Sequence, residues 1–236
     1  MSSGKYSGRN GILAEIYKSA APNVVTTLQK ILTDIWDNKG MPQDFKDATI
    51  IPLFKNKGSK IICHNYWRIS LSLVAGKIFA RVLLNQLISA VSEANLPETQ
   101  CRFRPGRSTI DMIFSIRQIQ EKFIEQNMNL FSVFTDLTKA FDTVNREGLW
   151  MILSKLGCPP KLVKIIHLFH EGMQGQVLFN GDLTDSFPVS NGVKQGCVLA
   201  PVLFNLFFTQ VLIMLQMDST EAYTSDKDTT AQSYKA

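Results

Sequence analysis

The chain has 236 residues, of which 45% are hydrophobic, so it is long enough for one large globular domain or two small ones with a packed core. Its formal net charge of +5 is a modest basic excess, which permits contact with a polyanion without requiring it. The four cysteines are far apart and form no Cys-x-x-Cys pair, so neither a zinc site nor a disulfide framework is indicated. The N-terminus carries no signal-peptide pattern, and we expect an intracellular protein of the nucleus or cytoplasm rather than a secreted one.

The first part of the chain predicts helices and then a strand. Glycines among polar residues in 1–20 indicate a loop that enters a short helix. Residues 22–36 place apolar side chains at helical spacing behind a proline, which is the pattern of an amphipathic helix. The run 48–54 is rich in β-forming residues, but Pro52 interrupts it. Because proline cannot donate to a neighbouring strand, this run favours an edge strand.

Two clusters of basic residues suit contacts with the phosphates of a nucleic acid. They are Lys55, Lys57 and Lys60 in a turn-like segment, and Arg102, Arg104 and Arg107 around an aromatic residue and a second turn. A solvated turn explains the lysines equally well, and arginines that pair with nearby carboxylates explain the second cluster. Each cluster therefore leaves both interpretations open.

Helical spacing returns farther along the chain. Residues 74–91 place isoleucine, valine and leucine at intervals of three and four. Ser108 and the aspartate three residues later form a capping-box pattern in front of a helix over 110–123. Two shorter helices are expected over 146–156 and 159–169, with a glycine and prolines between them.

The stretch 131–142 combines a short apolar run with a single carboxylate. Phe131–Thr135 predicts a buried strand, and Asp136 follows where the strand gives way to a turn and a helix. A carboxylate at the carboxyl end of a buried strand has a rigid backbone behind it and open space ahead, so a divalent cation and its phosphate ligand can reach it. An aspartate that caps the next helix explains the same position. The stretch alone leaves both interpretations open.

Two β-rich runs, 176–179 and 186–190, lie on either side of Asn180-Gly181 and predict a hairpin whose turn is longer than two residues. The loop 191–196 follows, and its two glycines allow a backbone to come close to a ligand at the start of a helix. The apolar segment 197–217 is long enough to cross a bilayer, yet it contains amides and a proline and lacks flanking anchors. We therefore expect a buried core helix and no membrane partner. From residue 218 the composition predicts a disordered tail.

Taken in order, six segments of the chain resemble the reverse transcriptases of non-LTR retrotransposons of the LINE and jockey type. They are Ser7–Tyr17, Asp47–Gly58, Asn65–Leu71, Gln100–Thr109, Phe134–Asp142 and Gly192–Pro201. The likeness runs from about Ser7 to Leu212.

This resemblance implies an α+β fold of the right-hand polymerase type. A fingers-like region is expected over 1–126 and a partial palm over 127–216, ahead of a disordered, non-homologous tail over 217–236. The activity that the resemblance implies is RNA-directed DNA polymerisation, in which Mg²⁺ ions assist transfer of a nucleotide from a dNTP. The implied partners are an RNA template and a DNA primer.

The resemblance also assigns roles to residues. It implies that Asp136 is a catalytic, metal-binding aspartate and that the carbonyl of Leu137 is a further metal ligand. Phe141 matches the bulky residue that lies under the sugar and favours dNTPs over rNTPs. Asp142 follows it, and we expect a structural role for this residue.

Four further residues match the nucleotide site of such polymerases. Lys55 and Arg68 match cations that neutralise phosphate charge, while Gln195 and Gly196 match the loop that lines the nucleotide and template site. The sequence departs from the family pattern here, because Trp67 stands where the family has arginine and Arg68 lies one position later. The basic residues of the two clusters are expected to contact nucleic acid.

The largest departure is the absence of the Asp-Asp pair that completes the two-metal site in such polymerases. The late candidate Asp226-Lys-Asp228 lies in the polar tail and is expected to be solvated. We therefore expect a C-terminally truncated or frame-shifted polymerase that lacks the second catalytic hairpin and the thumb and is inactive. Two alternatives are a nucleic-acid-binding remnant without catalysis and a poorly folded product that exposes the helix over 198–215.

Overall fold

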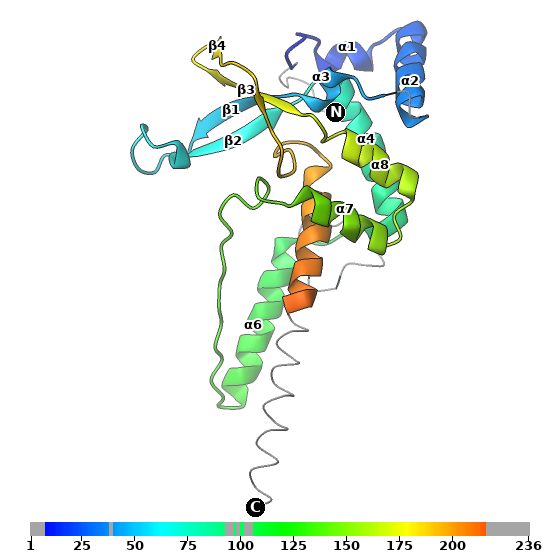
Figure 1. Cartoon of the computed structure of the whole chain (residues 1–236). Coiled ribbons are helices and arrows are strands. Elements are labelled where there is room, and N and C mark those ends of the chain that lie inside the picture. The colour runs from blue at the N-terminus through cyan, green and yellow to red at the C-terminus, as the bar shows by residue number, and fades with distance from the viewer. Residues whose placement is uncertain (1–7, 38–39, 93–96, 98–99, 102–105, 216–236) are drawn as a thin grey trace, which may run out of the picture.

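The computed structural model describes residues 8–37, 40–92, 97, 100–101 and 106–215 (Figure 1). Arg102, Arg104, Asp226, Asp228 and the expected tail over 217–236 lie outside these residues. Helices make up most of the regular structure. In chain order they are α1 (Ala14–Lys18), α2 (Pro22–Trp36), α3 (Gln43–Lys46), α4 (Val74–Leu87, continued by a π-helical turn over Ile88–Ser92), α6 (Thr109–Glu125), α7 (Arg146–Lys155), α8 (Pro160–Leu168) and an unlabelled helix, Ala200–Leu215.

One small mixed sheet joins distant parts of the chain. Its strands are β1 (Ala48–Phe54), β2 (Tyr66–Leu71), β3 (Gln174–Phe179), β4 (Asp182–Leu183) and β5 (Phe187–Pro188). β1 pairs antiparallel with β2 and parallel with β3, and β3 pairs antiparallel with β4 and β5. Strands from both sides of the expected fingers–palm boundary near residue 127 thus belong to one sheet.

Pro52 explains how far the pairing of β1 extends. β3 pairs only with Ala48, Thr49 and Ile50, whereas β2 pairs along nearly all of β1. Among the described strands, the half of β1 that contains Pro52 therefore has a neighbour on one side only, and a residue without an N–H is tolerated at such an edge. The expected edge strand is correct for this half and wrong for the first half, which is paired on both sides.

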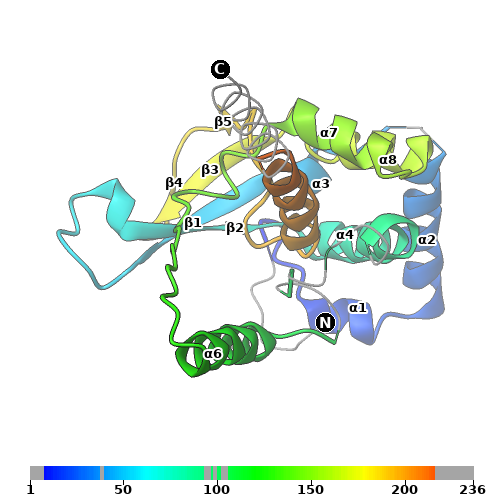
Figure 2. The same cartoon turned by 90° about the horizontal axis from the view of Figure 1, so that it is seen from below.

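The core lies among helices on one side of the sheet. Fully buried side chains of α4, α7, α8 and the helix Ala200–Leu215 pack together, and Figure 2 shows these helices gathered beside the sheet. Phe79 of α4 lies edge-on to Phe169, with ring centroids 6.2 Å apart. The helical patterns predicted for 74–91, 146–156 and 159–169 are confirmed to within a few residues, because apolar spacing of three and four directs one face of each helix into this core.

Among the described residues, one helix is long and apolar enough to raise the question of a membrane, and Ala200–Leu215 is a shorter apolar helix. The window Val74–Val91 has the length and hydropathy to cross a bilayer, but half of it is buried against other elements, as in a core helix. The helix Ala200–Leu215 is buried at Leu203 and Leu206 and exposed from Leu212 onward. The expected core helix is therefore confirmed for its first half.

α6 begins where the capping-box pattern predicts. The Ser108 N–H donates to the Asp111 carboxylate at 2.7 Å, and the Ile110 N–H donates to the Ser108 hydroxyl at 3.2 Å. No residue of α6 is buried, and Figure 2 shows this helix apart from the core helices. Its ends are therefore fixed by local hydrogen bonds rather than by packing.

The predicted hairpin around Asn180-Gly181 is confirmed, since β4 and β5 both pair with β3, but its turn has two residues rather than the longer turn predicted. Phe179 pairs with Asp182, and both turn residues have positive φ, 52° and 95°, as a two-residue type I′ turn requires.

The predicted strand Phe131–Thr135 is wrong in this structure. The segment forms no regular element, and Phe131, Val133 and Phe134 are 88–91% exposed. An apolar strand is stable when strands pair with its edges and other elements cover its faces, and among the described residues no strand lies against this one. The turn and helix predicted after Asp136 are present, because residues 138–143 form turns and α7 begins after Asn145.

Candidate functional site

Three segments that are far apart in the sequence meet at one point beside the sheet. They are β2, the turns of 139–144 and the loop of 190–197. The Ser70 N–H of β2 donates to the Gln195 carbonyl at 2.8 Å. The Gly192 N–H donates to the Val144 carbonyl at 3.0 Å, and the Val193 N–H donates to the Phe141 carbonyl at 2.8 Å. The loop is therefore hydrogen-bonded to the other two segments.

Two glycines make this close approach possible. A Cβ on Gly192 would lie 2.6 Å from the Asp142 carbonyl oxygen and 2.7 Å from the Asp142 Cα. A Cβ on Gly196 would lie 2.6 Å from the Ser70 carbonyl oxygen. Both glycines have positive φ, 76° and 108°. The sequence predicted that these glycines let a backbone approach a ligand, and here the groups that approach them are backbone atoms of the same chain.

An ion pair connects β2 to the turns of 139–144. The Arg68 guanidinium contacts the Asp142 carboxylate at 2.8 Å, and both side chains are partly exposed. They line a cavity of about 270 Å³ together with Gln195. We expected a structural role for Asp142. Here its carboxylate holds Arg68, the cation predicted to bind phosphate, by an ion pair.

Strand alternation decides which residues face this cavity. Ile50 pairs with Ser70, and Pro52 pairs with Arg68, so Arg68 and Ser70 lie on the same face of the sheet. Thr49 lies on the opposite face with its partners Leu71 and Gln176.

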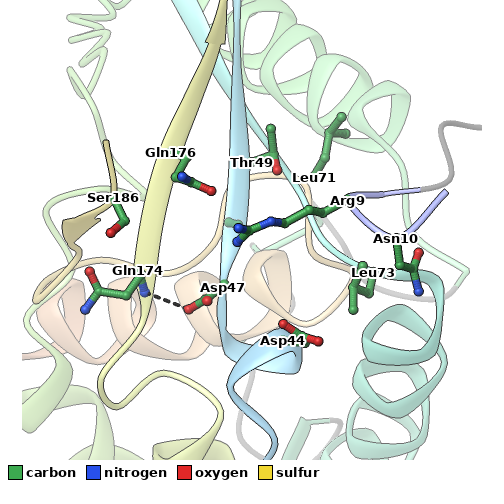
Figure 3. Close-up of a pocket in the computed structure, with 11 residues that line it drawn as sticks. Arg9, Asn10, Asp44, Asp47, Thr49, Leu71, Leu73, Gln174, Gln176 and Ser186 are labelled. Carbon is green, nitrogen blue, oxygen red and sulfur yellow. Dashed lines mark hydrogen bonds between the residues drawn. The ribbon is translucent and has the colours of Figure 1, made fainter. Parts of the chain in front are cut away.

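These three residues line a second cavity, of about 420 Å³, on that opposite face. Figure 3 shows Arg9 directed toward β1 and β3 in this cavity, and the Asp47 carboxylate accepting a hydrogen bond from the Gln174 N–H at 3.0 Å. Asp47 also accepts from the Gln43 amide at 2.7 Å, so it fixes the start of β3 beside β1.

Phe141 lies between the loop and the core. Its carbonyl accepts from Val193, and its ring packs on Phe204 with centroids 4.9 Å apart. Its backbone therefore borders the candidate site while its ring is half buried against the helix Ala200–Leu215.

Asp136 and Leu137 are not brought to the cavity. Both are exposed in the irregular segment, and neither lines the cavity with Arg68 and Gln195. Among the described residues no group of three His, Cys, Asp or Glu side chains could hold a metal ion. A single carboxylate with one carbonyl does not fit a two-metal site, which needs further oxygen ligands.

The predicted lysine cluster lies in the β1–β2 loop, which projects from the sheet (Figure 1). Lys55 donates to the His64 carbonyl at 3.0 Å, and Lys60 lies 5.6 Å from the centre of the Phe54 ring. Lys57 is exposed. Arg107 is exposed just before α6, in a different part of the chain.

Sequence reasoning missed two cations beside the loop. The Lys194 side chain is 3% exposed and donates to the Phe45 carbonyl at 3.2 Å above the Phe169 ring. Burial lowers the pKa of Lys194 to about 8. Arg146 is the first residue of α7, where the positive end of the helix dipole disfavours a cation. That unfavourable placement was the one signal in the sequence that could have identified Arg146.

Comparisons with known proteins agree with the resemblance stated above. Residues 55–229 match the family model described as reverse transcriptase (RNA-dependent DNA polymerase), which is more than half of the chain. The match continues past Leu212, where the likeness seen in the sequence ends.

Three similar proteins come from mobile elements. Over 76% of the chain, it is 29% identical to the RNA-directed DNA polymerase from mobile element jockey of Drosophila melanogaster. Over 86% of the chain, it is 25% identical to the probable RNA-directed DNA polymerase from transposon BS of the same species. Over 95% of the chain, it is 25% identical to the transposon TX1 uncharacterized 149 kDa protein of Xenopus laevis. The matches cover 20%, 22% and 17% of these relatives, so the chain spans about a fifth of their length.

Proposed function

The chain belongs to the reverse transcriptase (RNA-dependent DNA polymerase) family, with LINE- and jockey-type relatives, and from this premise we propose that the cavity beside Arg68, Asp142 and Gln195 binds a dNTP. One observation carries the proposal. Arg68, Phe141, Gln195 and Gly196 were assigned to the nucleotide site from three separate segments, and these segments meet around this one cavity.

The electrostatics of the cavity suit a phosphate. A guanidinium offers several N–H donors in a plane, and its hydrogen bonds to phosphate oxygens are charge-assisted. The Asp142 carboxylate contacts one of these donors, Nη2, at 2.8 Å. Because the pair is partly exposed, its own contribution to stability is small, and a triphosphate can compete for Arg68.

Binding of a fluorescent dNTP in the presence of Mg²⁺ tests this proposal. Arg68→Ala should weaken binding about tenfold or more, since a hydrogen bond to a charged group contributes roughly 1.5–3 kcal/mol. Arg81→Ala is the matched control, because Arg81 is an exposed arginine of α4 that does not line the cavity. Equal affinity in the two variants, or no binding by the unmodified chain, would contradict the proposal.

The family implies the use of divalent metal ions, but the donors among the described residues do not complete a site for them. We propose that the chain alone does not extend a primer, because its sequence has no Asp-Asp pair and the described residues hold no group of three His, Cys, Asp or Glu side chains that could bind a metal ion. A primer-extension assay with an RNA template, a DNA primer, dNTPs and Mg²⁺ should show no product. Synthesis that Asp136→Ala abolishes would show that the chain is active.

A further inference from the structure

The Arg146 side chain makes an unusually complete set of hydrogen bonds to main-chain carbonyls. Its Nε donates to Gly192 at 2.9 Å, and its Nη2 donates to Asn191 at 3.2 Å. Its Nη1 donates to His170 at 2.8 Å and to Val189 at 2.9 Å. One guanidinium therefore connects the start of α7 to the end of α8 and to the loop 189–192.

These hydrogen bonds explain how a cation is tolerated at the first residue of α7. The first residue of a helix lies at the positive end of its dipole, where a positive charge is disfavoured. Four carbonyl oxygens around the guanidinium supply the compensating negative partial charge. Burial lowers the pKa of Arg146, and an arginine so placed still keeps its charge at neutral pH.

The loop depends on this side chain because its backbone is irregular. From Val189 to Gly196 the backbone forms no helix or strand, so its carbonyls depend on other donors, and a main-chain carbonyl without a partner is costly where water is excluded. Arg146 satisfies three of them. Lysine has a single nitrogen without the planar arrangement of donors, so it cannot reproduce contacts from Nε, Nη1 and Nη2.

The same loop carries two contacts of the candidate site. Gly192 packs directly on Asp142, which is the ion-pair partner of Arg68. Three residues farther on, the Gln195 carbonyl accepts from Ser70 on the strand that carries Arg68. A displacement of the loop would therefore move Gln195 and Asp142 relative to Arg68.

We propose that Arg146 is a positioning residue for nucleotide binding: it borders the same cavity, but its donors are held by main-chain carbonyls, and it fixes the loop 189–196 so that Gln195 and Asp142 face Arg68. This inference rests on the proposed dNTP site. It goes beyond that site because it makes Arg146, which lies outside the motifs matched to nucleotide binding, responsible for the geometry of the site.

The test compares the variants Arg146→Lys and Arg146→Ala with the control Arg81→Lys, each made in the full 236-residue chain. The hydrogen-exchange rates of the Ser70, Gly192 and Val193 amides measure how firmly the loop is held. Titration with a fluorescent dNTP measures the affinity of the site. Arg146→Lys should accelerate exchange and weaken dNTP binding about tenfold, while circular dichroism shows a folded protein. Low concentrations of guanidinium ion should restore binding to Arg146→Ala and leave Arg81→Lys unaffected.

The outcomes separate this inference from the proposed function. Accelerated exchange with unchanged dNTP affinity would show that Arg146 is only structural, and unchanged exchange would show that it does not fix the loop. If the unmodified chain binds no dNTP, the proposed site and the positioning role both fail, whatever the exchange data show about the loop. Binding that Arg68→Ala weakens but Arg146→Lys does not would overturn the positioning role alone.

Discussion

At the scale of single residues, the geometry of the candidate site depends on glycine, because a residue without a Cβ lets another backbone segment come close. Gly192 and Gly157 have nearly equal φ, 76° and 81°, but their surroundings differ. A Cβ on Gly192 would meet the backbone of Asp142 at 2.6 Å, whereas a Cβ on Gly157 would meet nothing within 4 Å. Substitutions at Gly157 and Gly192 therefore separate the free-energy cost of a side chain at positive φ from the cost of a steric clash.

Gly157→Ala should lower the free energy of unfolding by about 1–2 kcal/mol, the cost of placing a side chain in the left-handed region. Gly192→Ala should lower it by clearly more, since two backbone segments must also move apart. Urea denaturation of both variants measures the difference. Similar losses would mean that the loop moves away from Asp142 at no cost.

Sequence reasoning predicted which motifs come together in the candidate site better than it predicted their contacts. Arg68, Gln195 and Gly196 were predicted from motifs, and the structure places them together. The pairing of Arg68 with Asp142 and the four carbonyls on Arg146 were not predictable. Each links segments separated by tens of residues, and no local periodicity encodes such a contact.

At the scale of elements, helices were predicted well because their signals are local. The Ser108 cap and the apolar spacing of α4 lie within the elements that they define. The segment Phe131–Thr135 was predicted wrongly because a strand needs partners. Its apolar composition indicates a strand, but no described strand pairs with it.

Phe134→Ser should change the free energy of unfolding by less than about 0.5 kcal/mol, because its side chain is 88% exposed and loses little contact. It should also raise solubility, since it removes an exposed aromatic ring from a β-prone segment. Phe79→Ala, by contrast, should cost about 3–5 kcal/mol because Phe79 is buried in the core. Chemical denaturation and light scattering check both effects, and a large loss for Phe134→Ser would mean that this segment is packed in solution.

At the scale of the whole molecule, Lys194 links the loop to the core. Its Nζ lies 4.1 Å from the centre of the Phe169 ring, and it donates to Phe45 at the end of α3. Its pKa of about 8 in the folded chain lies below its ordinary value of 10.5. The unfolded chain therefore binds more protons at this position between these two pH values, and stability rises with pH there.

Lys194→Met removes this pH dependence. The buried charge destabilises the unmodified protein by up to about 3 kcal/mol below pH 8, and this cost disappears as the pH rises toward 10.5. The stability of the unmodified chain relative to Lys194→Met should therefore increase over this range. Urea denaturation at pH 7.5 and pH 10 measures it, and a constant difference between the two proteins would show that Lys194 does not titrate there.

The parallel pairing of β1 with β3 also has a consequence during synthesis. Ala48 finds its partner Gly175 only after the whole intervening chain has left the ribosome. Until then one edge of β1 has open N–H and C=O groups, and contacts between such distant residues form slowly. A nascent chain that stops before β3 would retain β1 and β2 but leave that edge open, as a target for chaperones or for pairing with other nascent chains.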